Sequence, residues 1–136
     1  MSKPRQREVI IADKAPKAIG PYSQGIRYGD LVFTAGQIGL DYTTGQLVEG
    51  GLEAQTRRVL ENIKSILEAS GSSLENVIKT TVFMLNLEDF AAMNAIYAEY
   101  FKQDFPARST VQVSALPKGG QIEIEAVAMV GVGRGD

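Results

Sequence analysis

The segment FPARSTVQV (Phe105–Val113) has the pattern of a loop that turns into a strand, with a single arginine at the junction. Pro106 has no backbone N–H donor and a fixed φ, so it suits the start of a strand rather than its middle. Side chains alternate after it, as they do on a strand. One face would carry Ser109, Val111 and Val113, and the other Arg108, Thr110 and Gln112.

The segment Gln121–Val130 alternates in the same way and follows a short loop, LPKGG. One face would carry Ile122, Ile124, Ala126 and Ala128, and the other Glu123, Glu125, Val127 and Met129. If the two strands pair through that loop, Arg108 and the two glutamates line a common face. A fixed cation beside carboxylates suits binding a small carboxylate and moving a proton next to it. The alternative is that these are solvated charges on the polar face of an amphipathic sheet.

The composition is that of one ordinary globular domain. The chain has 136 residues, 44% of them hydrophobic and 22% charged. This length is sufficient to bury a core, and the composition is too apolar for a disordered chain. We expect a single domain over residues 1–136, with flexible tails at about 1–6 and 131–136. The net charge of −2 and a pI near 5.2 argue against a dedicated nucleic-acid-binding protein. No apolar run suits a membrane span or a signal peptide, so the sequence predicts a cytoplasmic protein without a membrane partner.

The sequence contains no histidine, cysteine or tryptophan. This excludes disulfides, Cys/His zinc sites, Ser-His-Asp triads and cysteine nucleophiles. Any catalysis then depends on Arg, Glu, Asp, Lys, Tyr, Ser or Thr, on backbone groups and on water. A metal site made only of carboxylates stays open, but no D-x-D-x-D-G loop is present and we expect no metal.

The rest of the chain predicts further strands and two helices. Strands are expected at Arg7–Ala12, Tyr22–Tyr28, Leu31–Gln37 and Ile78–Leu85, a short edge strand at Gln46–Val48, and helices at about Leu52–Ala69 and from Asn86 or Asp89 to Phe101. The pair Gly29-Asp30 suits a two-residue hairpin turn. Ser72 and Glu75 form a capping-box pattern ahead of one helical turn, SSLENV.

Apolar spacing assigns a buried stripe to each helix. The stripe of the first is Leu52, Val59, Leu60, Ile63, Ile66 and Leu67, and that of the second is Phe90, Met93, Tyr97 and Phe101. Asn94 lies beside the second stripe, where it would either tie the helix to the sheet or face a cleft. Gly36 ends an apolar run, where it either allows a close approach or a bulge, or simply ends the strand.

The element order β-β-β-α-β-α-β-β favours an α+β domain, a mixed β-sheet with two helices packed on one face. That arrangement leaves Val127 and Met129 on the other face of the sheet. Such a surface is too apolar for a monomer, so we expect it to be buried against other copies of the chain. Arg108, Glu123 and Glu125 would then lie near subunit boundaries, where clefts are common binding places.

Five motifs together resemble the RidA family, also called YjgF/UK114. They are GPYSQG (20–25), TAGQI (34–38), KTTVFM (79–84), FPARS (105–109) and IEIEAVA (122–128). The likeness runs from about Glu8 to Val130. It implies a chorismate-mutase-like fold of the bacillus type and a homotrimer, a trimeric barrel with three sites at the subunit interfaces. It also implies hydrolytic deamination of 2-imino acids and their enamine tautomers, such as 2-iminobutanoate and 2-iminopropanoate, to 2-oxo acids and ammonia, without a cofactor.

The resemblance also implies roles for particular residues. Arg108 would clamp the substrate carboxylate, Glu123 would activate the attacking water, and Tyr22 would help close the site. The Gly36 backbone would offer a donor and the Thr110 backbone would touch the imine nitrogen, while Asn94 matches an asparagine near the family's site. Many relatives have cysteine at the position of Thr110, so thiol chemistry does not transfer to this chain.

Two further points stay open at the level of sequence. Alternation does not choose between Glu123 and Glu125 as the base; only the resemblance favours Glu123, and Glu125 would otherwise be a structural partner for a cation. The same pocket would also suit a non-catalytic regulatory trimer that binds a small carboxylate. RNA binding, attached to some relatives, is disfavoured by the acidic pI and by the lack of histidine.

Overall fold

The computed structural model describes residues 6–131. The tails expected at 1–6 and 131–136 lie outside this range except for their innermost residues. The strands are β1 (Arg7–Ile10), β2 (Gly25–Tyr28), β3 (Leu31–Thr34), β4 (Val77–Met84), β5 (Ala107–Gln112) and β6 (Ile122–Met129), and the helices are α1 (Gly51–Ala69) and α2 (Phe90–Tyr100). Short 3-10 helices occupy Leu74–Asn76, Leu87–Asp89 and Pro117–Gly119. This is the expected element order.

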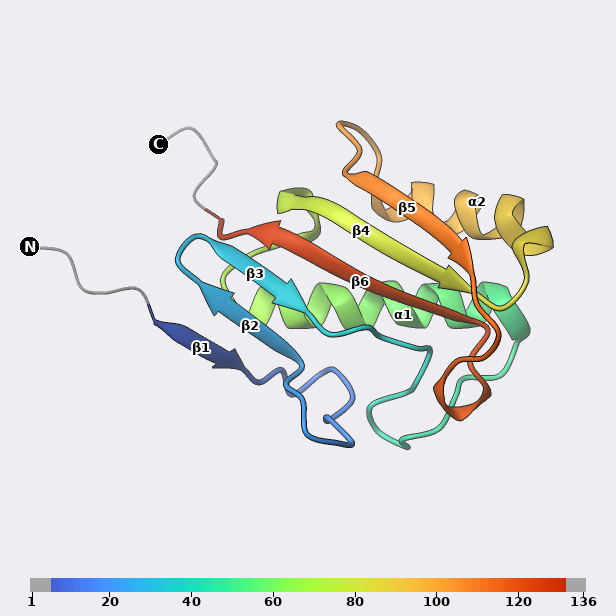
Figure 1. Ribbon diagram of the computed structural model, residues 1–136, viewed down its shortest axis with the longest axis horizontal. Helices are drawn as coiled ribbons and strands as arrows, with labels where there is room; N and C mark the ends of the chain where they lie inside the picture. Colours follow the sequence, from blue (N-terminus) through green and yellow to red (C-terminus); the bar gives the residue numbers. More distant parts are fainter. Residues whose placement is uncertain (1–5, 132–136) are drawn as a thin grey trace, which may run out of the picture.

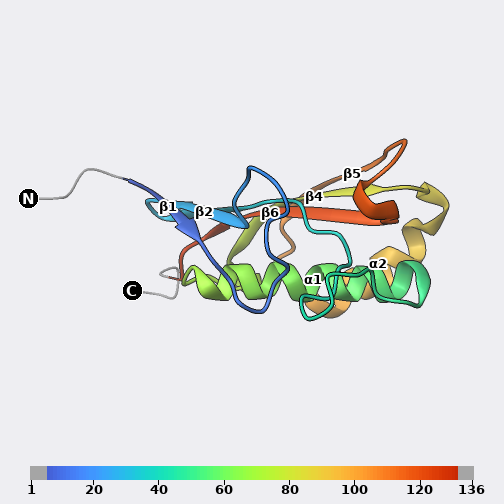
Figure 2. The same cartoon turned by 90° about the horizontal axis from the view of Figure 1, so that it is seen from below.

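The strands form one mixed sheet in the order β1-β2-β3-β6-β4-β5 (Figure 1). The β4–β5 pair is parallel, and every other neighbouring pair is antiparallel. Both helices lie on the same side of the sheet (Figure 2). The expected α+β architecture, with two helices packed on one face, is therefore confirmed.

The expected pairing of β5 with β6 is wrong, because β4 lies between them. The chain leaves β4, crosses the sheet as α2 and returns as β5, and a crossover of this kind places the second strand parallel to the first. β5 therefore occupies the outer edge of β4. The other edge of β4 pairs with β6 from Val77↔Ala128 to Met84↔Ile122. The short loop after β5 joins two strands that are not neighbours.

The core lies between the sheet and the helices. All six residues of the expected stripe on α1 are buried, and so are Ile122, Ile124, Ala126 and Ala128 of β6. The alternation read from β6 is thus confirmed, and it fixes the helix-facing side of that strand. Burial of apolar side chains at about 25 cal/mol per Å2 is the main stabilising contribution to such a core.

The segment after β1 is fixed by one buried glutamine, Gln24. Its Nε2 donates to the carbonyls of Ala12, Ala15 and Pro16, at 3.1, 3.2 and 2.8 Å, and its Oε1 accepts from the Ala12 amide at 2.7 Å. Because the side chain takes over these backbone groups, β1 ends at Ile10 and not at Ala12 as expected. β2 likewise begins only at Gly25, after this contact.

Two smaller expectations are corrected. The segment SSLENV does form a 3-10 turn, but its N-cap is Ser73 and makes no side-chain capping bond, while the Ser72 hydroxyl donates to the Met129 carbonyl. The expected edge strand at Gln46–Val48 is reduced to a single bridge, Leu40↔Leu47. The hairpin turn at Gly29-Asp30 is confirmed, and Gly29 has the left-handed φ of 62° that favours glycine there.

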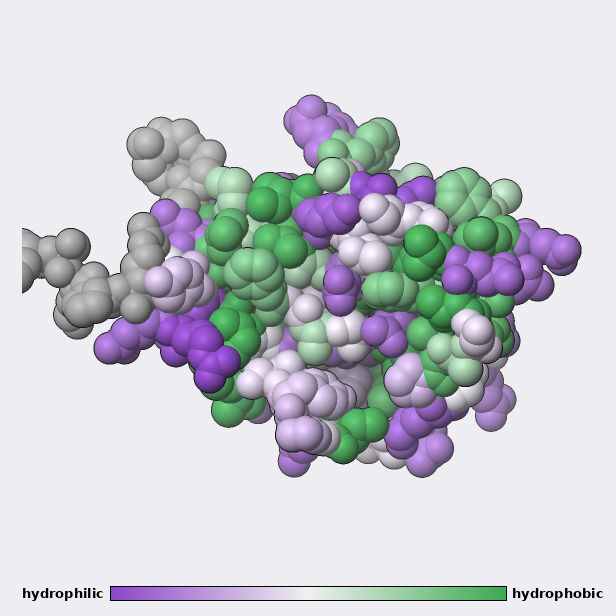
Figure 3. Space-filling model, in the orientation of Figure 1, coloured by the Kyte–Doolittle hydropathy of each residue, from purple (hydrophilic) through white to green (hydrophobic). Residues whose placement is uncertain are grey.

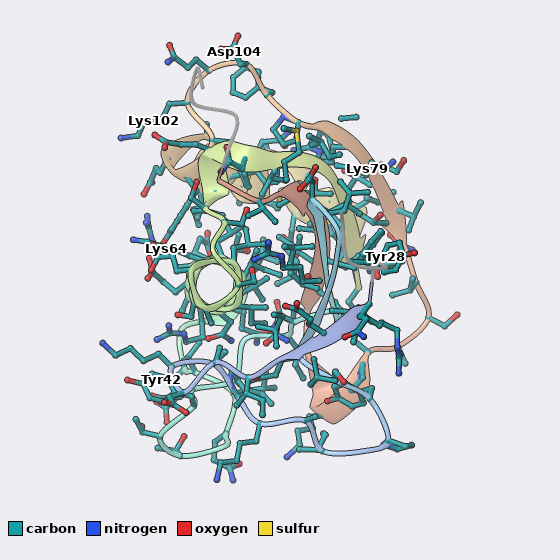
Figure 4. All side chains as sticks on the ribbon, turned by 90° about the vertical axis from the view of Figure 1, so that its left-hand side faces the viewer. Tyr28, Tyr42, Lys64, Lys79, Lys102 and Asp104 are labelled. Carbon is teal, nitrogen blue, oxygen red and sulfur yellow. The ribbon has the colours of Figure 1, made fainter. Side chains whose placement is uncertain are left out.

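The face of the sheet opposite the helices is open in the single chain. Phe33 and Val111 keep 44% and 42% of their surface exposed on it, and Figure 3 shows hydrophobic residues gathered between hydrophilic ones on this side. Figure 4 looks along α1, with Lys64 on its outer side and Tyr28 and Lys79 on the sheet side. Within residues 6–131 no helix is both long and apolar enough to cross a membrane.

Replacing Gln24 by alanine is expected to lower the free energy of unfolding by about 2–4 kcal/mol, because buried backbone groups of Ala12 and Ala15 lose their partners. Urea unfolding measures this loss. The matched control is Gln46→Ala, an exposed side chain, expected to change the free energy by no more than about 0.5 kcal/mol. Equal losses in the two variants would contradict the role given to Gln24.

Candidate functional site

The expected site residues fall into two separate clusters. Tyr22, Gly36 and Glu123 line one hollow of about 320 Å3 on the open side of the sheet. Arg108 lies on the edge strand β5, against the rings of Tyr97 and Phe90 on α2. The hollow does not include Arg108, Thr110 or Asn94.

The strand register explains this separation. Arg108 pairs with Thr80 of β4, and Thr80 is buried with its hydroxyl 2.7 Å from the Tyr97 hydroxyl, so Arg108 is on the helix side. Glu123 lies between Ile122 and Ile124, which are fully buried under the helices, so it points to the open side. The expectation that the two charges share a face is therefore wrong within one chain. The side chains of each strand alternate as expected, but the registers of β5 and β6 with the intervening β4 determine which side chains of the two strands share a face.

A β-bulge opens the hollow. β3 pairs with β6 up to Phe33↔Val127, and pairing resumes at the Gln37↔Ile124 bridge. Three residues, 34 to 36, therefore oppose only two, 125 and 126. The Thr34 hydroxyl accepts from the Ala126 amide at 3.0 Å inside the bulge. Of the two possibilities for Gly36, close approach at a bulge is the one observed.

Gly36 is required by the position of the Glu123 side chain. A Cβ built on Gly36 would overlap Oε2 of Glu123 and lie 2.7 Å from its Cδ. The glycine backbone thus contacts the carboxylate directly. The Gly36 amide has no hydrogen-bond acceptor within residues 6–131, so it remains available as a donor beside that carboxylate.

The surroundings of Glu123 are unfavourable for its charge. The hollow is lined largely by apolar residues: Pro16, Ile19, Ile38, Leu40 and Pro117. Burial raises the pKa of Glu123, and the negative charge of Glu125 two residues along the strand raises it further. A carboxylate with a raised pKa is a better proton acceptor, and its acid form is present closer to neutral pH. The effect of Glu125 on Glu123 was not anticipated from the sequence.

Tyr22 stands at the rim of the hollow, half exposed. Its hydroxyl accepts a hydrogen bond from the Ile19 amide at 3.2 Å. The segment on its N-terminal side is the one that Gln24 fixes, and Lys17 of that segment also lines the hollow. This contribution of Gln24 was not predicted from the sequence, because a single glutamine in a loop has no periodicity to mark it.

Arg108 is held by aromatic faces. Its Cζ lies 4.7 Å from the ring centroid of Tyr97 and 5.5 Å from that of Phe90. No carboxylate among the described residues forms an ion pair with it. Phe90 was expected in the buried stripe of α2 but is 40% exposed, because it begins the helix and covers Arg108 instead of the core.

Asn94 and Thr110 lie near Arg108 and not near Glu123. Asn94 follows Phe90 by four residues on α2 and precedes Tyr97 by three, so it shares their helix face. It is half-buried, and its side chain makes no hydrogen bond to other residues in 6–131, so it does not tie the helix to the sheet. Thr110 pairs with the buried Val82, which places it on the same side of β5 as Arg108. No group of acidic residues within 6–131 is arranged to hold a metal ion.

The chain is similar in sequence and in structure to several known proteins. Residues 12–130 match the family model described as endoribonuclease L-PSP. A RutC family protein of Pyrococcus abyssi is 55% identical over 90% of this chain and 96% of its own, and human 2-iminobutanoate/2-iminopropanoate deaminase is 50% identical over 92% and 91%. The structure of E. coli TdcF with bound serine is 44% identical, covers 90% of this chain and 98% of its own, and superposes with a TM-score of 0.86.

The substitution Gly36→Ala is expected to move the Glu123 carboxylate out of the hollow, because the added Cβ would take its place. The carboxylate is the end of a flexible side chain, so stability should change by less than about 1 kcal/mol. The pKa of Glu123 should fall toward the ordinary glutamate value as its desolvation is relieved.

Carboxyl NMR titration of Glu123 measures this shift, with urea unfolding alongside. Gly20→Ala is the matched control, since a Cβ there meets only the Tyr22 ring, at ordinary distances of 3.5 and 3.6 Å. An unchanged Glu123 pKa in Gly36→Ala would show that the glycine does not set the carboxylate's position.

Proposed function

Because the chain belongs to the RidA family, whose model is described as endoribonuclease L-PSP, we propose that it hydrolyses 2-imino acids to 2-oxo acids and ammonia. The observation that carries the proposal is Glu123, a carboxylate with a raised pKa in an apolar hollow. Relatives 46–50% identical to this chain bear the name 2-iminobutanoate/2-iminopropanoate deaminase. The net charge of −2 disfavours the RNA substrate that the family description suggests.

The proposed chemistry is the addition of water to a C=N bond. Glu123 accepts a proton from water as the oxygen bonds to the imine carbon, and the proton returns to the nitrogen. Glu123 then takes the hydroxyl proton of the tetrahedral intermediate and passes it to the amino group, the C–N bond breaks, and ammonia leaves as the C=O bond of the 2-oxo acid forms, so one water enters and one ammonia leaves. A carboxylate with a raised pKa suits both steps, since it binds the proton and releases it within one cycle.

Arg108 is proposed to bind the substrate carboxylate. A planar guanidinium binds a carboxylate through two parallel charged hydrogen bonds. Arg108 suits this role because no carboxylate within residues 6–131 neutralises it. The serine bound to TdcF, a relative with 44% identity, is itself a small carboxylate, which supports a ligand of this class.

The other expected residues have proposed roles that follow from their positions. Tyr22, at the rim of the hollow, would close the site over the ligand. The unpartnered Gly36 amide would donate a hydrogen bond beside Glu123. Asn94 and the backbone of Thr110, near Arg108, would contact the carboxylate end of the ligand and its nitrogen.

A complete site would need two copies of the chain. Arg108 and Glu123 are on opposite faces of one sheet, so a single small molecule cannot contact both within a protomer. The edge of β5 in one copy would have to lie against the open face of another, near its hollow. The exposed Phe33 and Val111 on that face favour such a contact, and we propose a homotrimer with three sites between subunits.

The first test is imine turnover. 2-Iminobutanoate is generated in place from threonine by a dehydratase, and 2-oxobutanoate formation is compared with the spontaneous rate. Arg108→Ala and Glu123→Gln should each lower kcat/KM by about a hundredfold or more, since one loses the clamp and the other the base. Wild-type protein that binds 2-oxobutanoate without accelerating hydrolysis would instead be a non-catalytic carboxylate-binding protein.

The two-copy site has a sharper test in mixed oligomers. Arg108→Ala and Glu123→Gln chains are co-expressed with different tags, and the mixed species is isolated. In an isolated mixed cyclic trimer, sites built from two subunits would pair an intact arginine with an intact glutamate at one site of the three, so about a third of wild-type activity should be recovered. Each variant alone is the control. No recovery from a verified mixed oligomer would mean that both residues act within one chain.

A further inference from the structure

We propose that Tyr97 and Thr80 are positioning residues for Arg108. Together with Phe90 they form a cradle that fixes the guanidinium for a substrate carboxylate. We call these three residues the arginine cradle. The inference rests on the proposed function, because it gives Arg108 the task of binding that carboxylate. It adds residues that touch neither the substrate nor the reacting atoms.

The rings of the cradle hold the cation by its flat face. Both centroids lie within the roughly 6 Å of a cation–π contact to the guanidinium carbon. A guanidinium stacked in this way still has in-plane N–H groups for a carboxylate. A lysine ammonium has no such plane, so the cradle also selects arginine over lysine.

The ring of Tyr97 is itself fixed from two sides. Its hydroxyl is 2.7 Å from the Thr80 hydroxyl, and both side chains are buried, at 6% and 1% exposure. Its ring centroid lies 4.6 Å from that of Phe101. Thr80 is also the β4 residue that pairs with Arg108. The hydroxyl pair therefore joins the strand beside the arginine to the helix that carries its ring.

The alternative is that these residues only fill the core, and two observations count against it. Phe90 is 40% exposed although it contacts Arg108, which a core-filling ring would not be. Arg108 is half-buried without an ion-pair partner in the described part of the chain. An acidic partner would compete with the substrate for the guanidinium, whereas aromatic faces stabilise the cation and leave its charge available.

The test separates positioning from packing. Tyr97→Leu removes the ring, and it should raise KM and weaken 2-oxobutanoate binding by about tenfold, with a much smaller change in kcat. Tyr97→Phe keeps the ring and loses only the hydroxyl, so it should restore most of the affinity. Thr80→Val should match Tyr97→Phe, and the double variant Tyr97→Phe/Thr80→Val should be no worse than either, because one hydrogen bond is removed in all three.

Two controls lie on the same helix. Met93→Ala makes a cavity at a fully buried residue, and Tyr100→Phe removes a tyrosine hydroxyl that donates to Glu61. Tyr100→Phe should leave the affinity for 2-oxobutanoate unchanged, and Met93→Ala should lower stability while weakening the affinity much less than Tyr97→Leu does. Titration calorimetry gives the affinities, and the NMR shift of Arg108 Nε, which the rings should perturb, gives the position of the guanidinium.

The outcomes are distinct. Equal losses of affinity in Tyr97→Leu and Met93→Ala would mean general loosening of α2 and would overturn the cradle. An unchanged affinity in Tyr97→Leu would overturn it as well. Failure of the proposed function is recognised separately, since the wild type would then not accelerate imine hydrolysis, whereas the cradle is judged by how the variants change the affinity for 2-oxobutanoate.

Discussion

The parallel pairing of β4 with β5 is the constraint on which the rest of this structure depends. Parallel neighbours need a crossover connection, and here the crossover is α2, which packs on the sheet beside the strand it leads to. The register Thr80↔Arg108 then sets the arginine directly against the side chains of that helix. The same pairing forces β6 to the other edge of β4. One topological choice thus fixes both the environment of Arg108 and its distance from Glu123.

Keeping the two charges apart has an electrostatic consequence. Side by side in one chain, an arginine and a glutamate would form an ion pair and lower the pKa of the carboxyl group. In the observed arrangement, burial in a largely apolar hollow raises the pKa of Glu123, and the charge of Glu125 raises it further. Arg108 lies against two aromatic rings and forms no ion pair within residues 6–131.

The sequence predicts the local features of the fold well and the long-range ones less well. Periodicity found α1, its buried stripe, and the two faces of β6, because these depend on residues close together in the chain. It did not predict that Arg108 and Glu123 are on opposite faces of the sheet, because this depends on β4, which lies between β5 and β6. Phe90 has the spacing of a core residue but covers a cation instead. Gln24 and the hydroxyl of Thr34 act through single contacts, which leave no repeating pattern.

The bulge after β3 makes room for the hollow while the hydrogen bonding of the sheet is largely kept. A Cβ at position 36 would take the place of the Glu123 carboxylate, and the glycine in the bulge leaves that space open. The ladder bond lost at Ala126 is replaced by the Thr34 hydroxyl, so the cost to the sheet is small. Glu123 and Arg108 are therefore both held by rigid elements, whereas the rim of the hollow is a loop fixed by Gln24. Changes in that loop would alter the shape of the hollow without disturbing the two charges.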